Sequence, residues 1–469
     1  MSVILLIFLF FQNVVASDGY SKSPPSESDT DDANNRTTLD IIWSCLTTIF
    51  ACSWIAVHSN IPSPEDKWGI VLARRLKLMF WAIIAPEMIL AWSIRQWLGA
   101  RYIAREYRDA PFRWTVVHGH FIQMGGFMLY QEDTPLRTLS IEELHSLFLD
   151  GKVEWPRLSA EAIVDKSKGD FLAKGLVILQ TGWFVVQCIS RGAEGLVLTA
   201  LEIVTLAFCT LNGLMYIFWW NKPLDVQCAI PVYLKDESVN SYSDAEKAVN
   251  ETPPLNPAES PDKNQTLPIP VAEDRFIQHL YAMFCEDLRK KGLLWIFYYR
   301  LLYCPFVYPL LQMAYFHDMK TGAKRVPTFH VITFQYGERR KIGAALLVLF
   351  SASLFGAIHC IARTFDFPSA TTQMMWRVSS LVIACFPLGS VFLAGLQLAM
   401  LVLTKKTSQD GYSTSERLVL WLRSGIFVGY IAIYVMARLV LLFIALATLR
   451  NLPSGAFRAI EWTDFIPHL

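Results

Sequence analysis

Charged side chains lie deep inside several apolar runs of this chain, and they are its most informative candidates for chemistry. Arg438 lies in the middle of residues 425–449, and Glu87 and Glu202 occupy similar runs. A helix needs roughly 20 apolar residues to cross a bilayer, so the run around Arg438 is long enough. A guanidinium at bilayer depth costs at least ~2.5 kcal/mol, so we expect it to face protein or trapped water.

We predict that a carboxylate holds Arg438, with Glu202 as the first choice and Glu87 as the second. Glu87 follows Pro86, and a proline inside a helix frees a backbone carbonyl. The acid at this position is therefore either an ion or proton site or a paired or protonated structural residue. The sequence leaves both interpretations open.

Polar side chains also share one face on each of two neighbouring apolar runs. Glu202 and Asn212 lie on one face of 196–220, and Gln180 and Gln187 lie seven residues apart in 171–189. These faces could line a cavity, or they could join helices through hydrogen bonds worth about 0.6 kcal/mol each. The candidate intramembrane binding residues are Glu87, Gln180, Gln187, Glu202, Asn212 and Arg438.

The elements that position these residues are predicted from apolar length. With 53% hydrophobic and 18% charged residues, the chain is too apolar for an ordinary soluble protein. The net charge of +1 gives no hint of nucleic-acid binding. The fold class expected is all-α, a polytopic transmembrane helix bundle of about seven spans with two long polar loops. The spans are 40–57, 78–97, 171–189, 196–220, 342–361, 378–403 and 425–449.

The remaining segments are assigned by composition. Residues 1–16 resemble a signal peptide, and 17–38 read as a disordered tail whose sequon at Asn35 is predicted to be glycosylated. A span of 17 residues is marginal, so 114–130 fits a re-entrant or surface segment better. Residues 39–97 are expected to hold the first two membrane segments, and 98–170 to form a polar region with short helices. Residues 171–220 should form a transmembrane helical hairpin, and 221–341 a long loop with a disordered linker at 236–270 and an interfacial segment at 293–313. Three transmembrane helices should follow in 342–449, with 450–469 as the C-terminal tail.

The charges of the two polar regions conflict with simple alternation of the spans. A cleaved signal peptide places Asn35 outside. If each of the seven spans then crosses the membrane in turn, both polar regions also lie outside. Basic residues nevertheless flank these regions at their membrane ends, which favours the cytosol. Either residues 2–16 remain as an anchor, or the Pro86-Glu87 break makes 78–97 return to the side that it left.

Catalytic and metal-binding patterns are weak. His118 and His120 lie one residue apart, but no carboxylate or cysteine nearby completes a ligand set. The nine cysteines form no CxxC pair, and the chain has no GxSxG, HExxH or GxGxxG motif. We therefore predict no metal, no cofactor and no catalytic residues.

Four blocks of sequence carry a resemblance. They are Leu39-Asp-Ile-Ile-Trp-Ser-Cys-Leu-Thr-Thr-Ile-Phe-Ala-Cys, Val117-His-Gly-His-Phe-Ile-Gln-Met-Gly-Gly-Phe, Asp165-Lys-Ser-Lys-Gly-Asp and Trp219-Trp-Asn-Lys-Pro-Leu-Asp. From residue 39 to about 391, the chain resembles a large group of uncharacterised multi-pass membrane proteins of filamentous fungi. The resemblance implies an integral membrane location and nothing about activity.

Four classes of function remain. A transporter or channel would use the polar helix faces, and a membrane scaffold would recruit partners through the long regions. A seven-span receptor fits the span count but lacks its Asp-Arg-Tyr and Asn-Pro-x-x-Tyr signatures. A membrane enzyme comes last because no nucleophile and base are paired. The expected partners are the lipid bilayer and an unknown small solute or protein, not nucleic acid, and the expected route is the secretory pathway.

Overall fold

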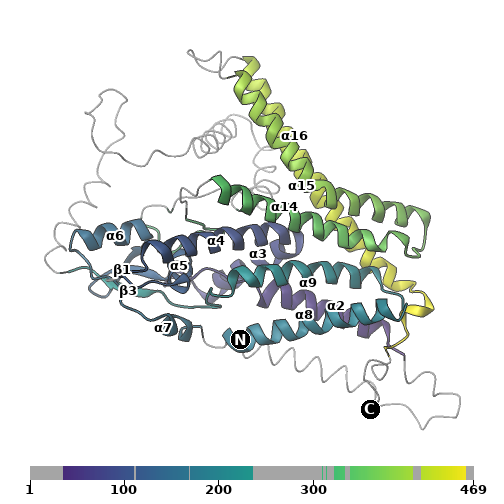
Figure 1. Cartoon of the computed structure of the whole chain (residues 1–469), viewed down its shortest axis with the longest axis horizontal. Helices are drawn as coiled ribbons and strands as arrows, with labels where there is room; N and C mark the ends of the chain where they lie inside the picture. The colour runs from purple at the N-terminus through teal and green to yellow at the C-terminus, as the bar shows by residue number, and fades with distance from the viewer. Residues whose placement is uncertain are drawn as a thin grey trace, which may run out of the picture.

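The computed structural model describes residues 35–109, 112–167, 170–235, 309, 313, 319, 322–332, 338–404 and 414–460. The predicted signal peptide, most of the N-terminal tail, the linker at 236–270 and the interfacial segment, apart from Pro309 and Met313, lie outside these residues. The described chain is mostly helical, as predicted (Figure 1).

Six helices in the described ranges are long and apolar enough to cross a membrane. In Figure 1, α2, α8, α9 and α14 lie roughly alongside one another, and α16 crosses the picture obliquely. The apolar parts of the six helices begin and end close to the predicted runs. They are α2 (Thr38–Phe50, continued by the π-helix η2, Ala51–Ile55), α8 (Asp170–Ala193), α9 (Ala200–Trp219), α14 (Glu338–Cys360, continued by the 3₁₀ turn η4, Ile361–Thr364), α15 (Ala370–Thr404) and α16 (Thr414–Ala447).

The predicted second span is instead a bent pair of helices. Helix α3 (Trp68–Ile84) and helix α4 (Pro86–Glu106) meet at Ala85 with a bend of 111°. Pro86 cannot donate a backbone hydrogen bond, so it begins α4 and does not continue α3. The break predicted at Pro86-Glu87 is confirmed.

Described parts of the two polar regions fold together into a small α/β unit. It contains α5 (Val116–Gln123), β1 (Phe127–Gln131), β2 (Thr134–Thr138), α6 (Ile141–Leu149), α7 (Ala160–Asp165) and β3 (Ile230–Tyr233). The sheet order is β2-β1-β3, with β2 antiparallel and β3 parallel to β1. Pro135 and Pro231 lie on the two edge strands, where the lack of an N–H discourages further strand pairing.

This unit corrects one prediction. The segment 114–130 belongs to its core, because Trp114, Phe121 and Phe127 are buried there. The three strands of the unit are a small part of the described residues, which are mostly helical, so the predicted all-α class is supported. Ser140 caps the start of α6, where its side chain accepts a hydrogen bond from the Glu143 N–H at 3.2 Å.

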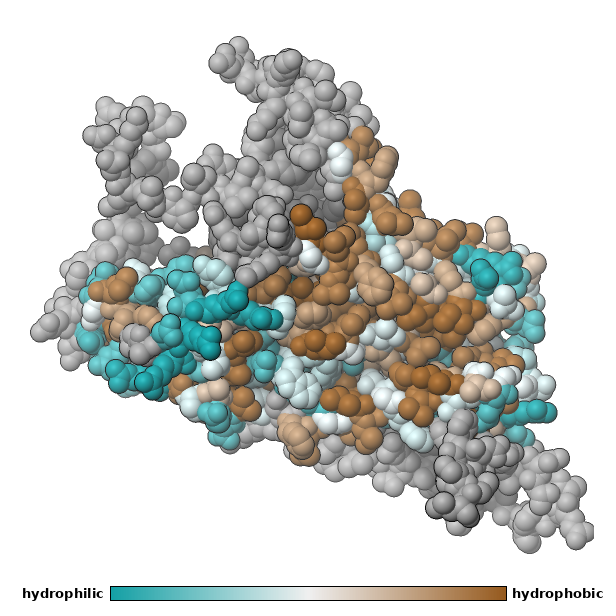
Figure 2. All heavy atoms as spheres, in the orientation of Figure 1, coloured by the Kyte–Doolittle hydropathy of each residue, from teal (hydrophilic) through white to brown (hydrophobic). Residues whose placement is uncertain are grey.

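Two hydrophobic cores result, one in the helix bundle and one in the α/β unit. Outside the bundle core, many large apolar side chains are exposed, among them Phe171, Leu388 and Phe443. Figure 2 shows hydrophobic residues over the helices and hydrophilic residues gathered toward the two ends of the molecule. A soluble monomer rarely exposes so much contiguous apolar surface.

The two ends of the bundle differ. At one end, here called the terminus end, Asn35 pairs with Arg458, and the Arg36 N–H donates to the Phe457 carbonyl at 2.8 Å. At the other, the domain end, the α/β unit joins the bundle, because α4 extends into its core through Ile103 and Tyr107. The start of α3 is also at the domain end, where Asp66 pairs with Arg325 at 2.7 Å.

Candidate functional site

Arg438 and Glu87 form a buried ion pair between α16 and α4. The Arg438 Nη2 donates to Glu87 Oε2, and both residues are less than a tenth exposed. The hydroxyl of Tyr434 accepts from Arg438 Nε at 2.9 Å and from Nη2 at 2.6 Å. The guanidinium carbon also lies 3.7 Å from the centroid of the Phe355 ring. Charge, hydrogen bonds and a cation–π contact together compensate the burial of the guanidinium.

The break in the α3–α4 pair explains why Glu87 can fill this role. Glu87 is in the first turn of α4, where the helix dipole favours a carboxylate. The first-choice partner predicted for Arg438, Glu202, was therefore wrong, and the second choice was right. Helical spacing placed Glu202 in a span but could not show how far along the bundle it lies.

Glu202 belongs to the terminus end. It closes a capping box with Thr199 at the start of α9 and pairs with Arg36, whose Nη1 lies 2.5 Å from Glu202 Oε1. Arg36 also donates to the Ala456 carbonyl at 2.6 Å. The acid thus ties the two described termini together.

The other candidate residues do not join Arg438 either. Gln180 of α8 donates to Thr48 of α2 at 3.0 Å, a contact between helices. Gln187 is half-buried further along α8. Asn212 of α9 is 5% exposed, and its Oδ1 has no hydrogen-bond partner among the described residues. The six candidates therefore form several separate contacts and not one polar cavity.

A buried lysine at the domain end was missed in the sequence. Lys222 is only 1% exposed, although it follows α9 by three residues. Its Nζ donates to the His58 carbonyl at 2.6 Å and to Gln96 Oε1 at 2.9 Å. The ammonium also lies over the rings of Trp92 and Trp219, at 4.7 and 4.6 Å from their centroids. In the sequence, Lys222 is only a charge that follows the apolar run 196–220, with no local sign that it is buried.

Gln96 connects this lysine to the α/β unit. It accepts from Trp219 Nε1 at 3.0 Å and donates to the His330 carbonyl at 3.0 Å. Gln123, at the end of α5, donates to the Gln96 carbonyl at 2.9 Å. One hydrogen-bonded network therefore joins α4, α9 and α5, and it fixes the unit against the bundle.

Burial governs the titration of this junction. Desolvation lowers the pKa of Lys222 well below its usual value. Desolvation, followed by the charges of Lys222 and Lys174, lowers the pKa of His120 to about 3. The same causes lower the pKa of His58 well below its usual value. The structure thus favours uncharged imidazoles at the junction, where His58 and His120 are buried in the core.

A groove of about 610 Å³ lies on the surface of the α/β unit. Phe148 and Trp155 contribute aromatic walls, Arg157 and Lys235 contribute cations, and Glu154 contributes a carboxylate 4.0 Å from Lys235. Trp155 is 5% exposed, and its indole N–H has no acceptor among the described residues. The groove has the size and mixed lining of small-ligand and peptide sites.

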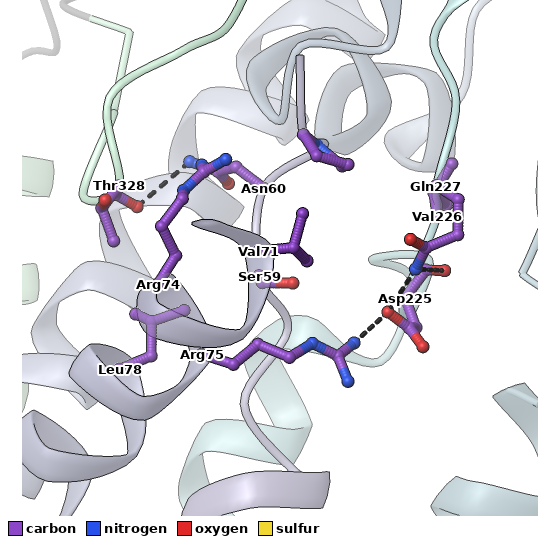
Figure 3. Close-up of a pocket in the computed structure, with 11 residues that line it drawn as sticks. Ser59, Asn60, Val71, Arg74, Arg75, Leu78, Asp225, Val226, Gln227 and Thr328 are labelled. Carbon is purple, nitrogen blue, oxygen red and sulfur yellow. Dashed lines mark hydrogen bonds and ion pairs between the residues drawn. The ribbon is translucent and has the colours of Figure 1, made fainter. Parts of the chain in front are cut away.

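A second, smaller pocket of about 20 Å³ lies beside the first turns of α3. Figure 3 shows Arg74 extending toward Asn60 and Arg75 extending toward Asp225. Arg75 pairs with Asp225, and Asn60 donates to the Thr328 carbonyl at 3.1 Å. The volume has room for about one water molecule.

The fold and these contacts define a mostly helical protein with six apolar helices, one bent helix pair and a small α/β unit. A family model described as a family of unknown function (DUF8562) matches residues 4–244 and 325–469. The chain belongs to this family. Neither a curated protein nor a solved structure matches the chain.

Proposed function

We propose that the chain is an integral membrane protein that crosses the bilayer six times and returns once through the α3–α4 pair. The six apolar helices and their exposed apolar side chains support insertion. The contact between Asn35 and Arg458 supports an even number of crossings, because it places both described termini at one end.

The charge distribution supports one orientation. With α3–α4 as a re-entrant pair, residues 98–167 and 225–235 both lie at the domain end. Arg105, Arg108 and Lys166 lie in the first of these segments, and positively charged loops favour the cytosol. The terminus end, with Asn35, then faces the lumen or the exterior, as expected for entry through the secretory pathway.

Integral insertion has a direct test. Alkaline carbonate extraction of membranes that contain the full chain should leave it in the pellet, because six apolar helices make insertion strongly favourable. Release into the supernatant would refute the membrane assignment.

Within this topology, we propose that the protein is a membrane scaffold whose α/β unit binds a partner. The observation that carries this proposal is the groove of about 610 Å³ with aromatic walls and two cations. In contrast, the buried Glu87–Arg438, Glu202–Arg36 and Gln180–Thr48 contacts hold helices or chain ends together.

A photo-crosslinking amino acid at Leu149, which is 71% exposed next to Phe148, tests the scaffold proposal in cells. A specific crosslinked product should form, and the charge reversal Arg157→Glu with Lys235→Glu should abolish it while the protein remains monodisperse. The same crosslinker at the exposed Glu132, on the β1–β2 turn, is the matched control. Equal products at both positions, or a product that survives the reversal, would contradict a role for the groove.

A transporter or channel is the second candidate, because a broken helix with a charged pair at its break resembles the discontinuous helices that line transport sites. Flux of a solute through liposomes that contain the purified chain should then change in Glu87→Gln but not in Glu202→Gln, since Glu202 lies at the terminus end. Unchanged flux in Glu87→Gln would remove this candidate.

A further inference from the structure

The groove on the α/β unit is bordered by an indole donor that lacks an acceptor. Trp155 lines the groove and is 5% exposed, and its N–H has no acceptor among the described residues. Buried indole donors usually have a partner. The rings that pack against Trp155 do not accept from it, and they are those of Tyr107, Phe112, Trp114 and Phe148. A carbonyl oxygen that entered the groove would supply the missing acceptor.

The same groove offers a cation to an acidic ligand. Glu154 lies 4.0 Å from Lys235, but its side chain is 87% exposed, so this pair contributes little. Arg157 is exposed and forms no ion pair within the part of the chain that is described. Beside these charges, Phe148 is only half-buried. A fitting ligand therefore combines free carbonyls, apolar rings or side chains and a carboxylate.

The sequence of this chain contains a segment with these properties. Pro253-Pro254-Leu-Asn-Pro257 is followed by Glu259 and Asp262. The spacing of Pro254 and Pro257 is the PxxP pattern that docks into aromatic-lined grooves as polyproline II. Carbonyls in that conformation have no internal hydrogen bonds, so they can accept from an outside donor.

The position of this segment in the chain also fits the groove. Lys235 lines the groove and is the last described residue before 236–308. Pro253 follows Lys235 by 18 residues, a stretch that can extend up to roughly 60 Å. Residues 236–252 contain no apolar run long enough to cross a bilayer, so segment and groove lie on the same side of the membrane. A tether of this kind gives an effective concentration of about 1 mM.

We propose that the groove binds the proline-rich segment 253–262 of the same chain. A carbonyl of the segment accepts from Trp155 Nε1, its prolines pack on Phe148, and one of its carboxylates meets Arg157. The inference rests on the groove as the binding site proposed above, and it adds the class of ligand: a proline-rich, acidic segment.

Intramolecular crosslinking tests this contact in the purified full chain in detergent. A photo-crosslinking amino acid at Leu149 should react with residues 250–263, identified by mass spectrometry, and the same amino acid at Glu132 should not. The change of Pro253, Pro254 and Pro257 to Ala should abolish the product. No product from Leu149, or equal products from Leu149 and Glu132, would overturn the proposal. In a mixture of isotope-labelled and unlabelled chains, a product that joins two copies would also overturn it.

A binding measurement uses a labelled synthetic peptide of residues 250–263 and its fluorescence anisotropy. The peptide should bind the triple proline variant at least about tenfold more tightly than the original chain, where the tethered segment competes. Equal binding to the two proteins would contradict this competition. A peptide with the same three alanines should not bind, and binding equal to that of the original peptide would contradict recognition of the prolines.

Two tryptophan variants test the donor separately from the ring. Trp155→Phe in the triple proline variant should weaken peptide binding about fivefold, because it removes one hydrogen bond and keeps an aromatic side chain. Trp114→Phe is the matched control, since its indole N–H also lacks an acceptor but does not line the groove. It should leave binding within about twofold of the parent. Equal effects of the two variants would overturn the role of Trp155. If Trp155→Phe does not fold, the triple proline variant alone decides.

Crosslinking from Leu149 in cells separates this inference from the scaffold role. A product with another protein and none with residues 250–263 would refute the proline-rich segment as ligand and leave the scaffold proposal standing. A product only with residues 250–263 would support the segment and count against an external partner at this groove.

Discussion

At the residue scale, burial of charge is solved differently at three places. Arg438 has a carboxylate, a hydroxyl and an aromatic face. Glu202 has a helix N-terminus and an arginine. Lys222 has two oxygen acceptors and two indole rings, with no carboxylate in contact in the part of the chain that is described. The first solution stabilises a helix break, the second joins chain ends, and the third fixes the α/β unit.

The Glu87–Arg438 pair predicts a specific double-mutant cycle. Arg438→Leu and Glu87→Leu should each cost ~3–5 kcal/mol of folding free energy, because each leaves a buried charge without its partner. The double variant should recover most of this loss. Folded yield and melting temperature in detergent measure the effect. Arg438→Leu with Glu202→Leu is the control pair and should be additive, and additivity of both pairs would contradict the observed contact.

His120 predicts acid sensitivity with a defined sign. Its pKa is about 3 in the folded state, against about 6.5 in an unfolded chain. As pH falls below 6.5, the unfolded chain binds a proton that the folded chain does not, so stability decreases until about pH 3. Between pH 7 and pH 5 this one residue should cost about 2 kcal/mol.

His120→Gln removes that titration. The variant should therefore lose about 2 kcal/mol less than the original chain over the same pH interval, measured from thermal unfolding in detergent at constant ionic strength. Parallel stability curves for the two proteins would show that His120 is already charged in the folded state.

At the scale of elements, apolar length located the helices but not their depth or partners. The six long apolar helices of the described residues and the Pro86 break were evident because long apolar runs and proline act locally. The α/β unit was not evident, since β1 and β3 are about 100 residues apart in sequence and meet only through long-range pairing. The partner of Arg438 was ambiguous for the same reason: periodicity defines a face, not a position along a neighbouring helix.

Close packing of α14 against α15 gives an element-level prediction. A Cβ on Gly356 would overlap the backbone of Ala384, whereas a Cβ on Gly343 of the same helix would meet nothing within 4 Å. Gly356→Ala should therefore destabilise the bundle by about 1–3 kcal/mol. Gly343→Ala, the matched control, should be neutral or stabilising because alanine favours helix. Equal melting temperatures for the two variants would contradict the close approach of these helices.

At the scale of the whole molecule, the proposed re-entrant pair would remove the conflict between charge and alternation. Seven crossings would separate the N-terminal tail from the C-terminus, but Asn35 and Arg36 contact the segment around Phe457 and Arg458. Six crossings, as proposed, would keep these termini together and leave residues 98–167 and 225–235 at the opposite end. The family model matches the chain on both sides of the segment 245–324 and does not include that segment.

Mapping of sugar acceptors tests this topology most directly. The three sequons at Asn35, Asn250 and Asn264 are examined one at a time, with the other two changed to Gln and an additional acceptor tag placed after Leu469 in a separate variant. Glycosidase-sensitive mass shifts are then measured in secretory membranes. The account predicts a sugar at Asn35 and on the C-terminal tag and none at Asn250 or Asn264. A sugar at Asn35 together with one at Asn250 or Asn264 would show that α3–α4 crosses the bilayer, and it would contradict the six-span topology.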